Sequence, residues 1–249
     1  MIASLPMYDR PETAGSLDRF WQLIRAELGY GPQSLDRRMP ISDVWASSDL
    51  LLSQTCGLPY RADLKDDVQL VGTLDYGLEG ADPGHYYSFF VTHASDGRSI
   101  DDFNAGRLAF NDAHSQSGWA APIHHAQAAG FSYGSYYESG SHFNSARAVL
   151  NNFADIAAID AQSWRLICRH DAFAERLQVI GRTDPTPALP LITGSKIDCN
   201  ALQQAIHAAI EALPPADRAA MDLQKMVQIP SQSFLDIPNP PSPDDLTTH

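Results

Sequence analysis

The first third of the chain alternates short apolar runs with segments of helical periodicity, and this alternation limits the folds it can adopt. Residues 1–7, 67–76 and 85–94 predict strands, and the last two are rich in β-branched or aromatic side chains. Between the first two runs, residues 13–29 and 43–57 predict helices. Alternating strands and helices are typical of α/β folds with a largely parallel sheet.

The helix predicted over residues 13–29 has the clearest pattern. Ser16 is the candidate N-cap and Gly29 the candidate stop. The helix predicted over residues 43–57 is shorter and ends near Gly57. The apolar face of the first helix consists of Leu17, Phe20, Trp21, Ile24 and Leu28.

The rest of the chain continues the same alternation. Pro122 is expected to bend or end one helix, and Phe153 is expected to face inward from another. Asp198 is the candidate N-cap of a long apolar-faced helix. Residues 183–194 predict an extended connector, and the proline-rich, acidic tail 236–249 predicts a frayed end. The remaining expected strands are 107–111, 154–160 and 178–183, and the expected helices are 99–106, 115–130, 142–153, 161–177, 198–214 and 215–226.

Charge excludes some classes of partner. The 249 residues carry a formal net charge of −13, with 44% hydrophobic and 19% charged residues, which is typical of a globular protein. Nucleic acids and anionic membranes both require clustered basic residues, so neither is expected as a partner. An acidic ligand must therefore be held locally, by helix N-termini or a few hydrogen-bond donors.

Cysteines, the first residues and hydropathy bear on the compartment. Cys56, Cys168 and Cys199 are far apart and odd in number, so reduced thiols are expected, without disulfides or a zinc site. The opening MIASLPMYDRPE lacks a leader pattern. As given, the sequence predicts a cytoplasmic protein, whereas a chain trimmed of a leader would be periplasmic. No apolar run is long enough for a membrane span, so no membrane insertion is expected.

The stretch NDAHSQSGWAAP, residues 111–122, places Ser115, Gln116, Ser117 and Gly118 at the start of a predicted helix. A helix start exposes backbone N–H groups and the positive end of the helix dipole, which together can hold a phosphate, phosphonate or carboxylate. We expect Gly118 to let a ligand approach the backbone closely. An ordinary N-cap, which needs only one serine, explains the same residues.

Five further residues are candidates for ligand contacts. Ser141 and His142 open the next helix, where an imidazole can donate to an anion or titrate. Asp160 ends an apolar strand and could accept hydrogen bonds from a ligand, although it is an equally good N-cap. Tyr8 and Thr55 lie in loops after the first strand and the second helix. Each of these residues also has a structural explanation without a ligand.

Enzyme chemistry has little support in the sequence. The GxGxxG, GxxxxGK[ST] and HExxH motifs are absent, and the SQSG stretch lacks the glycine that precedes the serine of a GxSxG elbow. The adjacent pair His124 and His125 points its two rings apart on a helix, and the paired aspartates lie in polar, loop-like settings. We therefore expect no catalytic residues, no metal and no cofactor.

Seven stretches in order give the chain a resemblance to a known family. They are SLPMYDRPE, SQTCGLPY, LVGTLDYGLEGADPGHYYS, NDAHSQSG, GSHFNSARAVL, ADIAAID and TDPTPALPLIT. Together they resemble the PhnD-like substrate-binding proteins of ABC transporters for phosphate, phosphite and phosphonate, which have the type 2 periplasmic-binding fold. The family's usual serine–threonine–serine run is SQSG here.

The resemblance implies two α/β lobes joined by two crossover strands that act as a hinge. It places residues 1–87 with 185–249 in lobe 1 and residues 88–184 in lobe 2. The implied function is capture of a small anion in the inter-lobe cleft and its delivery to a transporter permease. By the same resemblance, the anion lies on residues 115–118, with His142 and Asp160 beside it and Tyr8 and Thr55 on the other lobe.

Two other functions remain open at this point. The first is a cytosolic enzyme on the same fold, similar to pyrimidine-synthesising proteins; the absent leader favours it and the lack of a cysteine-rich motif opposes it. The second is a transferrin-like ferric-ion-binding protein that uses Tyr136, Tyr137 and His142.

Overall fold

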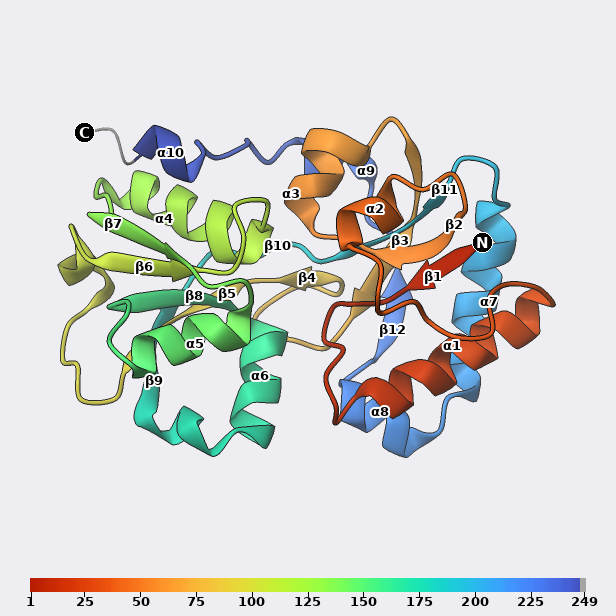
Figure 1. The fold of residues 1–249 in the computed structure, drawn as a ribbon, viewed down its shortest axis with the longest axis horizontal. Coiled ribbons are helices and arrows are strands. Elements are labelled where there is room, and N and C mark those ends of the chain that lie inside the picture. Colours follow the sequence, from red (N-terminus) through yellow and green to blue (C-terminus); the bar gives the residue numbers. More distant parts are fainter. Residues whose placement is uncertain (247–249) are drawn as a thin grey trace. The chain divides into compact units, whose positions relative to one another are not determined.

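The computed structural model describes residues 1–246, and the chain divides into two units (Figure 1). Unit 1 consists of Met1–His85 and Pro187–Ile237, and unit 2 of Tyr86–Thr186 and the segment from Pro238 on. The two inner boundaries lie within two residues of those expected from the sequence. The C-terminal segment from Pro238 on does not match the expectation: it was expected in the first lobe, whereas it belongs to unit 2.

Unit 1 is built on a five-stranded sheet in the order β1-β2-β11-β3-β12. Only β1 and β2 run parallel; β11 is antiparallel to both β2 and β3, and β12 is antiparallel to β3. The expectation of a largely parallel sheet is therefore wrong for this unit. The strands are β1 (Ile2–Ser4), β2 (Leu50–Gln54), β3 (Val68–Asp75), β11 (Pro190–Gly194) and β12 (Lys225–Val227).

Apolar clusters cover both faces of this sheet. Successive strand residues point to opposite faces, so Leu191 packs in a cluster with α1 and α7 while Ile192 packs in a second cluster with α2 and α9. The helical elements are α1 (Ala14–Leu28), α2 (Ile41–Trp45), α3 (Gly57–Pro59), the π-turn η1 (Tyr60–Leu64), α7 (Cys199–Ala212), α8 (Pro215–Met221) and α9 (Ser231–Leu235).

Residues 43–57 do not form the single helix expected from the sequence. The short helix α2 ends at Trp45, and the apolar run that begins at Leu50 becomes strand β2. All five residues of β2 are buried. A short, continuously apolar run fits a strand covered on both faces as well as a buried helix, so periodicity alone cannot distinguish the two.

Helix α1 begins three residues earlier than its serine suggested. Its N-cap is Thr13, and Gly29 ends it in the left-handed conformation, as expected. Ser16 lies in the first turn, where its hydroxyl donates to Asp217 Oδ1 at 2.7 Å. Arg19 Nε donates to Asp217 Oδ2 at 2.6 Å. The buried Asp217 therefore connects α1 to α8, 201 residues later in the chain.

Unit 2 also contains a mixed sheet, in the order β7-β6-β8-β5-β9. Strand β6 is parallel to β7 and β8, whereas β5 is antiparallel to β8 and β9. The expectation of a largely parallel sheet therefore holds here only for β7, β6 and β8. The strands are β5 (Ser88–His93), β6 (Arg107–Phe110), β7 (Ser135–Glu138), β8 (Ile156–Asp160) and β9 (Leu177–Arg182).

The helices of unit 2 begin mostly where the sequence indicated. Two residues, however, lie differently from what was expected. Pro122 does not end its helix but sits in the first turn of α4, directly after the π-helical turn η3. Phe153 does not face inward: it is 55% exposed and stacks on Tyr137. The helical elements are η2 (Ile100–Phe103), η3 (Gln116–Ala120), α4 (Ala121–Ala129), α5 (His142–Leu150), α6 (Ala161–His170), η4 (Ala172–Arg176) and α10 (Pro243–Leu246).

The chain passes between the units at two short strands, β4 (His85–Tyr86) and β10 (Thr186–Pro187), which pair with each other. On the unit 2 side, Ser88 N donates to Thr183 Oγ1 at 3.0 Å and Thr183 N donates to Ser88 O at 2.9 Å. Both crossings are therefore fixed to the same end of β5.

The C-terminal segment is not frayed over its described part. Residues 243–246 form α10, and Leu246 packs on the unit 2 core. The last three residues of the expected frayed tail, 247–249, lie outside the described residues. Among residues 1–246, no helix has the length and apolar character needed to cross a membrane.

We predict that Asp217→Ala destabilises the protein. It leaves the buried Ser16 hydroxyl without its acceptor, which costs about 1–3 kcal/mol. The neighbouring Arg19 guanidinium lowers the pKa of Asp217. A carboxyl whose pKa is lowered by folding stabilises the folded state above its unfolded pKa of about 3.9, and this contribution is lost as the pH falls.

Chemical denaturation of the parent and of Asp217→Ala between pH 3 and pH 7 measures both effects. Asp217→Asn is the matched control, since it keeps the shape of the side chain and removes the titration. Equal stabilities of the parent and Asp217→Ala at pH 7 would contradict the prediction.

Candidate functional site

Three neighbouring strands of unit 2 end at one edge of its sheet. Strands β7, β6 and β8 are adjacent and parallel, so their carboxyl ends lie together. Each is followed by a helix: β6 by η3 and α4, β7 by α5, and β8 by α6 (Figure 1). Three helix N-termini therefore gather at this edge, and each contributes the positive end of a helix dipole.

Ser115 is the N-cap of the first of these helices. Its Oγ accepts from the Gly118 N–H at 2.9 Å, and its carbonyl accepts from the N–H groups of Trp119 and Ala120 at 3.2 and 3.0 Å. Its hydroxyl therefore satisfies one of the unpaired N–H groups of the first turn, that of Gly118, which is the capping role that the sequence left open. The bonds to its carbonyl are the first main-chain bonds of η3. The N–H groups of Gly118, Trp119 and Ala120 are not available to a ligand in this conformation.

Ser117 is the point where three parts of the chain meet. Its Oγ lies 2.9 Å from His142 Nε2 and 3.4 Å from Ser115 Oγ. Its carbonyl accepts from the Ser88 hydroxyl at 2.7 Å. The structure thus brings the helix start at 115–118 into direct contact with the helix start at 141–142, as an anion site formed by both would need.

Gly118 has a packing role that the sequence did not suggest. A Cβ at this position would lie 1.8 Å from Asn111 Oδ1, so the side of Gly118 that we expected to admit a ligand is filled by Asn111. The main chain of Asn111 also accepts from Gly140 N at 3.0 Å. Gly118 and Asn111 together hold the loop after β6 against the loop before α5.

Gln116 lies in the same turn, and its side chain is buried, with 1% of the residue exposed.

His142 begins α5 and is held in a neutral state. Burial of its ring lowers the pKa of His142 to about 4, although the Ala158 backbone opposes the shift. Ser141, the residue before it, is the N-cap, with its Oγ accepting from Asn144 N at 3.1 Å. Ser139 Oγ contacts Ser145 Oγ at 2.7 Å and fixes the loop that leads into the helix.

Asp160 lies at the end of β8, 2% exposed. Its Oδ1 accepts from Ser163 N at 2.6 Å, so it is the N-cap of α6, as one of the two sequence interpretations held. In the sheet it stands opposite Ser88, whose hydroxyl contacts Ser117. Asp160 therefore belongs to the same edge as Ser117 and His142.

Tyr8 follows β1 in unit 1 and has a backbone φ of 64°, a conformation that costs free energy in a residue other than glycine. Thr13 Oγ1 stabilises it by donating to the Tyr8 carbonyl at 2.6 Å. The Tyr8 ring packs edge-to-face on Tyr76, with 4.9 Å between ring centroids. The loop is therefore held in one strained shape that fixes the position of the Tyr8 side chain.

Thr55 follows β2, the strand parallel to β1, so it lies at the same sheet edge of unit 1 as the Tyr8 loop. Its N–H donates to Pro190 O at 2.9 Å. Its side chain is fully buried, and among residues 1–246 its hydroxyl has no hydrogen-bond partner. Burying an unpaired hydroxyl costs free energy, so this group is a candidate for contact with a ligand.

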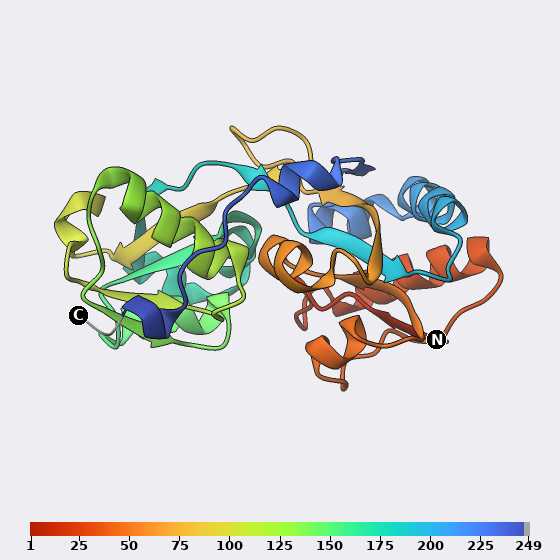
Figure 2. The same cartoon turned by 90° about the horizontal axis from the view of Figure 1, so that it is seen from above.

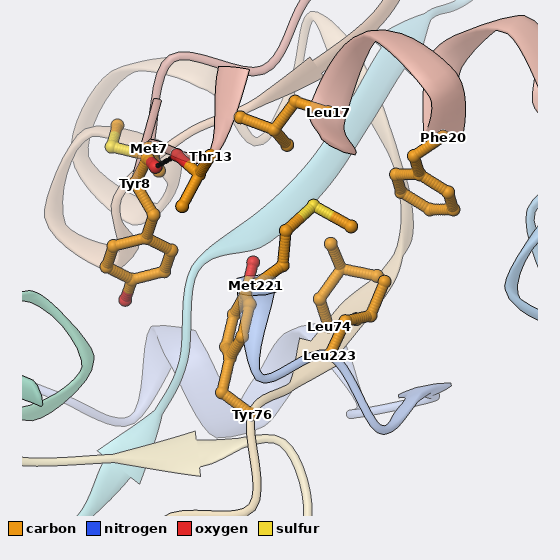
Figure 3. A pocket seen from close by; sticks show the side chains of 9 residues that line it. All are labelled: Met7, Tyr8, Thr13, Leu17, Phe20, Leu74, Tyr76, Met221 and Leu223. Carbon is orange, nitrogen blue, oxygen red and sulfur yellow. Dashed lines mark hydrogen bonds between the residues drawn. The ribbon is translucent and has the colours of Figure 1, made fainter. Parts of the chain in front are cut away.

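A small apolar pocket lies beneath the Tyr8 loop. Figure 3 shows its lining side chains, which come from that loop, α1, β3, Tyr76 and the end of α8 with the residues after it. Its volume is about 10 Å³, enough for a single water at most. The pocket is therefore a packing gap under Tyr8 and too small to hold a ligand.

A comparison with known protein families decides the family of this chain. The family described as the periplasmic substrate-binding proteins of ABC transporters for phosphonate matches residues 53–231. The chain belongs to this family. A comparison of the sequence of this substrate-binding protein with curated proteins gives no match.

Solved structures show the fold of this chain. PhnD1 from Prochlorococcus marinus, in complex with methylphosphonate, has a TM-score of 0.75 and 16% identity over 95% of this chain and 94% of that one. A binding protein of an ABC phosphonate transporter from Pseudomonas aeruginosa has a TM-score of 0.74 and 16% identity, covering 95% and 83%. XAC2383 from Xanthomonas citri, bound to ATP, has a TM-score of 0.66 and 16% identity, covering 99% and 95%. These similarities establish the type 2 periplasmic-binding fold of this substrate-binding protein.

The residues of the ferric-ion alternative are not brought together in this substrate-binding protein. Tyr136 and Tyr137 are neighbours on β7, so they face opposite sides of the strand. Tyr136 packs on Trp119 at 5.0 Å and Tyr137 stacks on Phe153 at 6.0 Å, whereas His142 contacts Ser117. Within residues 1–246, no cluster of three or more His, Cys, Asp or Glu side chains could hold a metal ion.

Two residues at the unit 2 edge were missed by the sequence analysis. Ser88 connects the crossing into unit 2 with the Ser117 carbonyl, and Thr183 connects Ser88 with the crossing out. The available signal for Ser88 was a lone hydroxyl in the aromatic run HYYSFFV. Its partners are 29 and 95 residues away, so nothing local could identify them.

We predict that Gly118→Ala destabilises the protein by about 1–3 kcal/mol, because the added methyl group overpacks the site filled by Asn111. The double variant Asn111→Ala, Gly118→Ala removes the clashing amide and should regain most of the loss. Denaturant unfolding of the three proteins measures the effect. A single variant as stable as the parent would show that the loop moves aside without cost.

We also predict that stability falls as the pH is lowered through the window from about 6.5 to about 4. The pKa of His142 is lower in the folded state than in the unfolded state, so the unfolded chain binds the proton first, at a cost of up to about 3 kcal/mol. His142→Gln keeps a nitrogen near Ser117 and cannot titrate. Melting temperatures over this pH range should fall less for the variant, and parallel curves would contradict the assignment.

Proposed function

We propose that this protein captures a small phosphonate-like or phosphate-like anion and delivers it to an ABC transporter permease. The family match supports the class of protein. The observation that carries the ligand class is the junction at Ser117, where two helix starts meet through the Ser117–His142 contact of 2.9 Å beside a third helix start at Asp160.

This junction suits an oxyanion held without formal positive charges. Helix N-termini and hydroxyl donors bind phosphate groups in many proteins. His142 is neutral at pH 7, and either Ser117 Oγ or His142 Nε2 can donate in the bond that they share. In the proposed complex His142 Nε2–H donates to Ser117 Oγ, and the Ser117 hydroxyl donates its hydrogen to a ligand oxygen. Ser115, Gln116, Gly118 and Ser141 shape and cap the two helix starts around it.

In this proposal unit 1 contributes Thr55 and Tyr8 to the same ligand. The buried Thr55 hydroxyl has no partner among the described residues, so a ligand oxygen or substituent that pairs with it gains a hydrogen bond without further desolvation of the protein. The fixed Tyr8 ring supplies an aromatic wall. Ligand binding by both units stabilises a closed arrangement, in which the two crossings serve as the hinge.

We further propose that the protein is not an enzyme. Ser117 and His142 lie at the distance of a nucleophile and its base, which is the observation that favours hydrolysis. However, a general base works best with a pKa near the working pH, and burial lowers the pKa of His142 to about 4. The Asp160 carboxylate accepts from Ser163 N as a helix cap. The Ser117–His142 pair is therefore better suited to binding.

The proposed working compartment is the periplasm, where proteins of this family meet the permease. Because the protein carries a net charge of −13, it can hold small anions only through local contacts such as those at Ser117.

Calorimetric titration with methylphosphonate and inorganic phosphate tests the function. Ser117→Ala should raise Kd roughly 10- to 100-fold, since a hydrogen bond to a charged ligand contributes about 1.5–3 kcal/mol. Thr55→Val, which keeps the shape of the side chain, should also raise Kd. Ser48→Ala, at an exposed serine in unit 1, is the control and should bind as the parent does.

Thermal denaturation gives an independent readout. Ligand at 100 times its Kd should stabilise the parent by about 2.7 kcal/mol. Neutral aromatic compounds that stabilise the protein when neither anion does would overturn the proposed ligand class.

A further inference from the structure

The C-terminal segment forms a third covalent connection between the units, in addition to the crossings at β4 and β10. Helix α9 belongs to unit 1, and the chain from Pro238 on belongs to unit 2. Figure 2 shows this dark-blue segment running from α9 to α10. Sequence composition predicted a frayed tail here, so its docking requires a physical explanation.

Both ends of the segment are anchored. On the unit 1 side, Phe234 in α9 is fully buried and packs edge-to-face on Tyr60. On the unit 2 side, Pro241 O accepts from Trp119 Nε1 at 3.0 Å. Beyond it, Leu246 packs on the unit 2 core, and Ser242 caps α10 by accepting from Asp245 N at 3.3 Å.

The chain between these anchors is short and stiff. Pro241 is seven residues beyond Phe234, so the two anchors cannot be farther apart than about 25 Å while both hold. Residues 238, 240, 241 and 243 are prolines. Proline-rich segments favour the extended polyproline conformation and act as semi-rigid spacers. The segment therefore resists both stretching and collapse.

The anchor in unit 2 lies in the same turn as the candidate anion site. Trp119 is two residues after Ser117, in η3, and its ring packs between Phe110 at 4.7 Å and Tyr136 at 5.0 Å. A force on the segment at Pro241 therefore reaches η3 directly.

We propose that residues 236–243 are a C-terminal strut, which limits how far the two units open and holds η3 in its binding position. The proposal rests on the proposed function, in which the units open and close around a ligand. A protein with only the two β4 and β10 crossings opens further, and a larger share of its ligand-free molecules is then unable to bind. The apparent Kd equals the intrinsic Kd divided by the fraction of ligand-free molecules that are able to bind, so a smaller fraction weakens the apparent affinity.

Lengthening the strut tests the idea while both anchors are kept. Six Gly and Ser residues are inserted between Ile237 and Pro238, and the control carries the same six residues after His249. Spin labels on the exposed Cys168 of unit 2 and on Glu27→Cys of unit 1 report the inter-unit distance in a Cys199→Ser background. The insertion should lengthen and broaden the ligand-free distance distribution and raise Kd for methylphosphonate about tenfold.

Two further variants separate the strut from general loss of stability. Pro238→Gly with Pro240→Gly keeps the length and removes stiffness, so it should broaden the distances without changing the melting temperature of unit 2. Trp119→Phe removes the hydrogen bond to Pro241 and should speed amide exchange in residues 116–120.

Unchanged distance distributions in both the insertion and the proline variants would overturn the strut. If neither methylphosphonate nor inorganic phosphate binds the parent, the proposed function fails while the distance measurement still tests the strut.

Discussion

The hydrogen bond from the Ser88 hydroxyl to the Ser117 carbonyl connects the fold of unit 2 to its candidate site. Ser88 is the first residue of β5, where the chain has just entered the unit, and it also pairs with Thr183, where the chain leaves. The turn that carries Ser117 is thus fixed to both crossings by contacts of 2.7 to 3.0 Å. Any rotation at the crossings acts on the helix start that faces the anion in our proposal.

Much of the architecture could be predicted from local sequence, and the failures have a common cause. Helices α1 and α7 have a clear apolar face, so their existence followed from the pattern, as did the end of α1 at Gly29 and the start of α7 at Asp198. The buried run at Leu50 and the antiparallel neighbours of β2 and β5 depend on what covers or pairs with a strand. Such partners come from distant parts of the chain and leave no local signal.

In the candidate site too, local features could be predicted from the sequence and contacts between distant residues could not. Ser115, Ser141 and Asp160 were predictable because each caps a helix within three residues of itself. The contact between Ser117 and His142 was implied only by the family resemblance, since 25 residues separate them. The role of Gly118 was misjudged for another reason: a glycine that makes room for Asn111 and one that makes room for a ligand look identical in sequence.

Neutral His142 has a consequence for how a ligand would arrive. The protein carries a net charge of −13, and the hydroxyl, imidazole and backbone groups at Ser117 add no compensating cation. An approaching anion is therefore repelled at long range and attracted only within the last few ångströms. Dissolved salt screens the long-range repulsion and leaves the short-range attraction intact. The association rate is therefore lowest at low ionic strength and rises with added salt. This is the reverse of the salt dependence that attractive electrostatic steering gives.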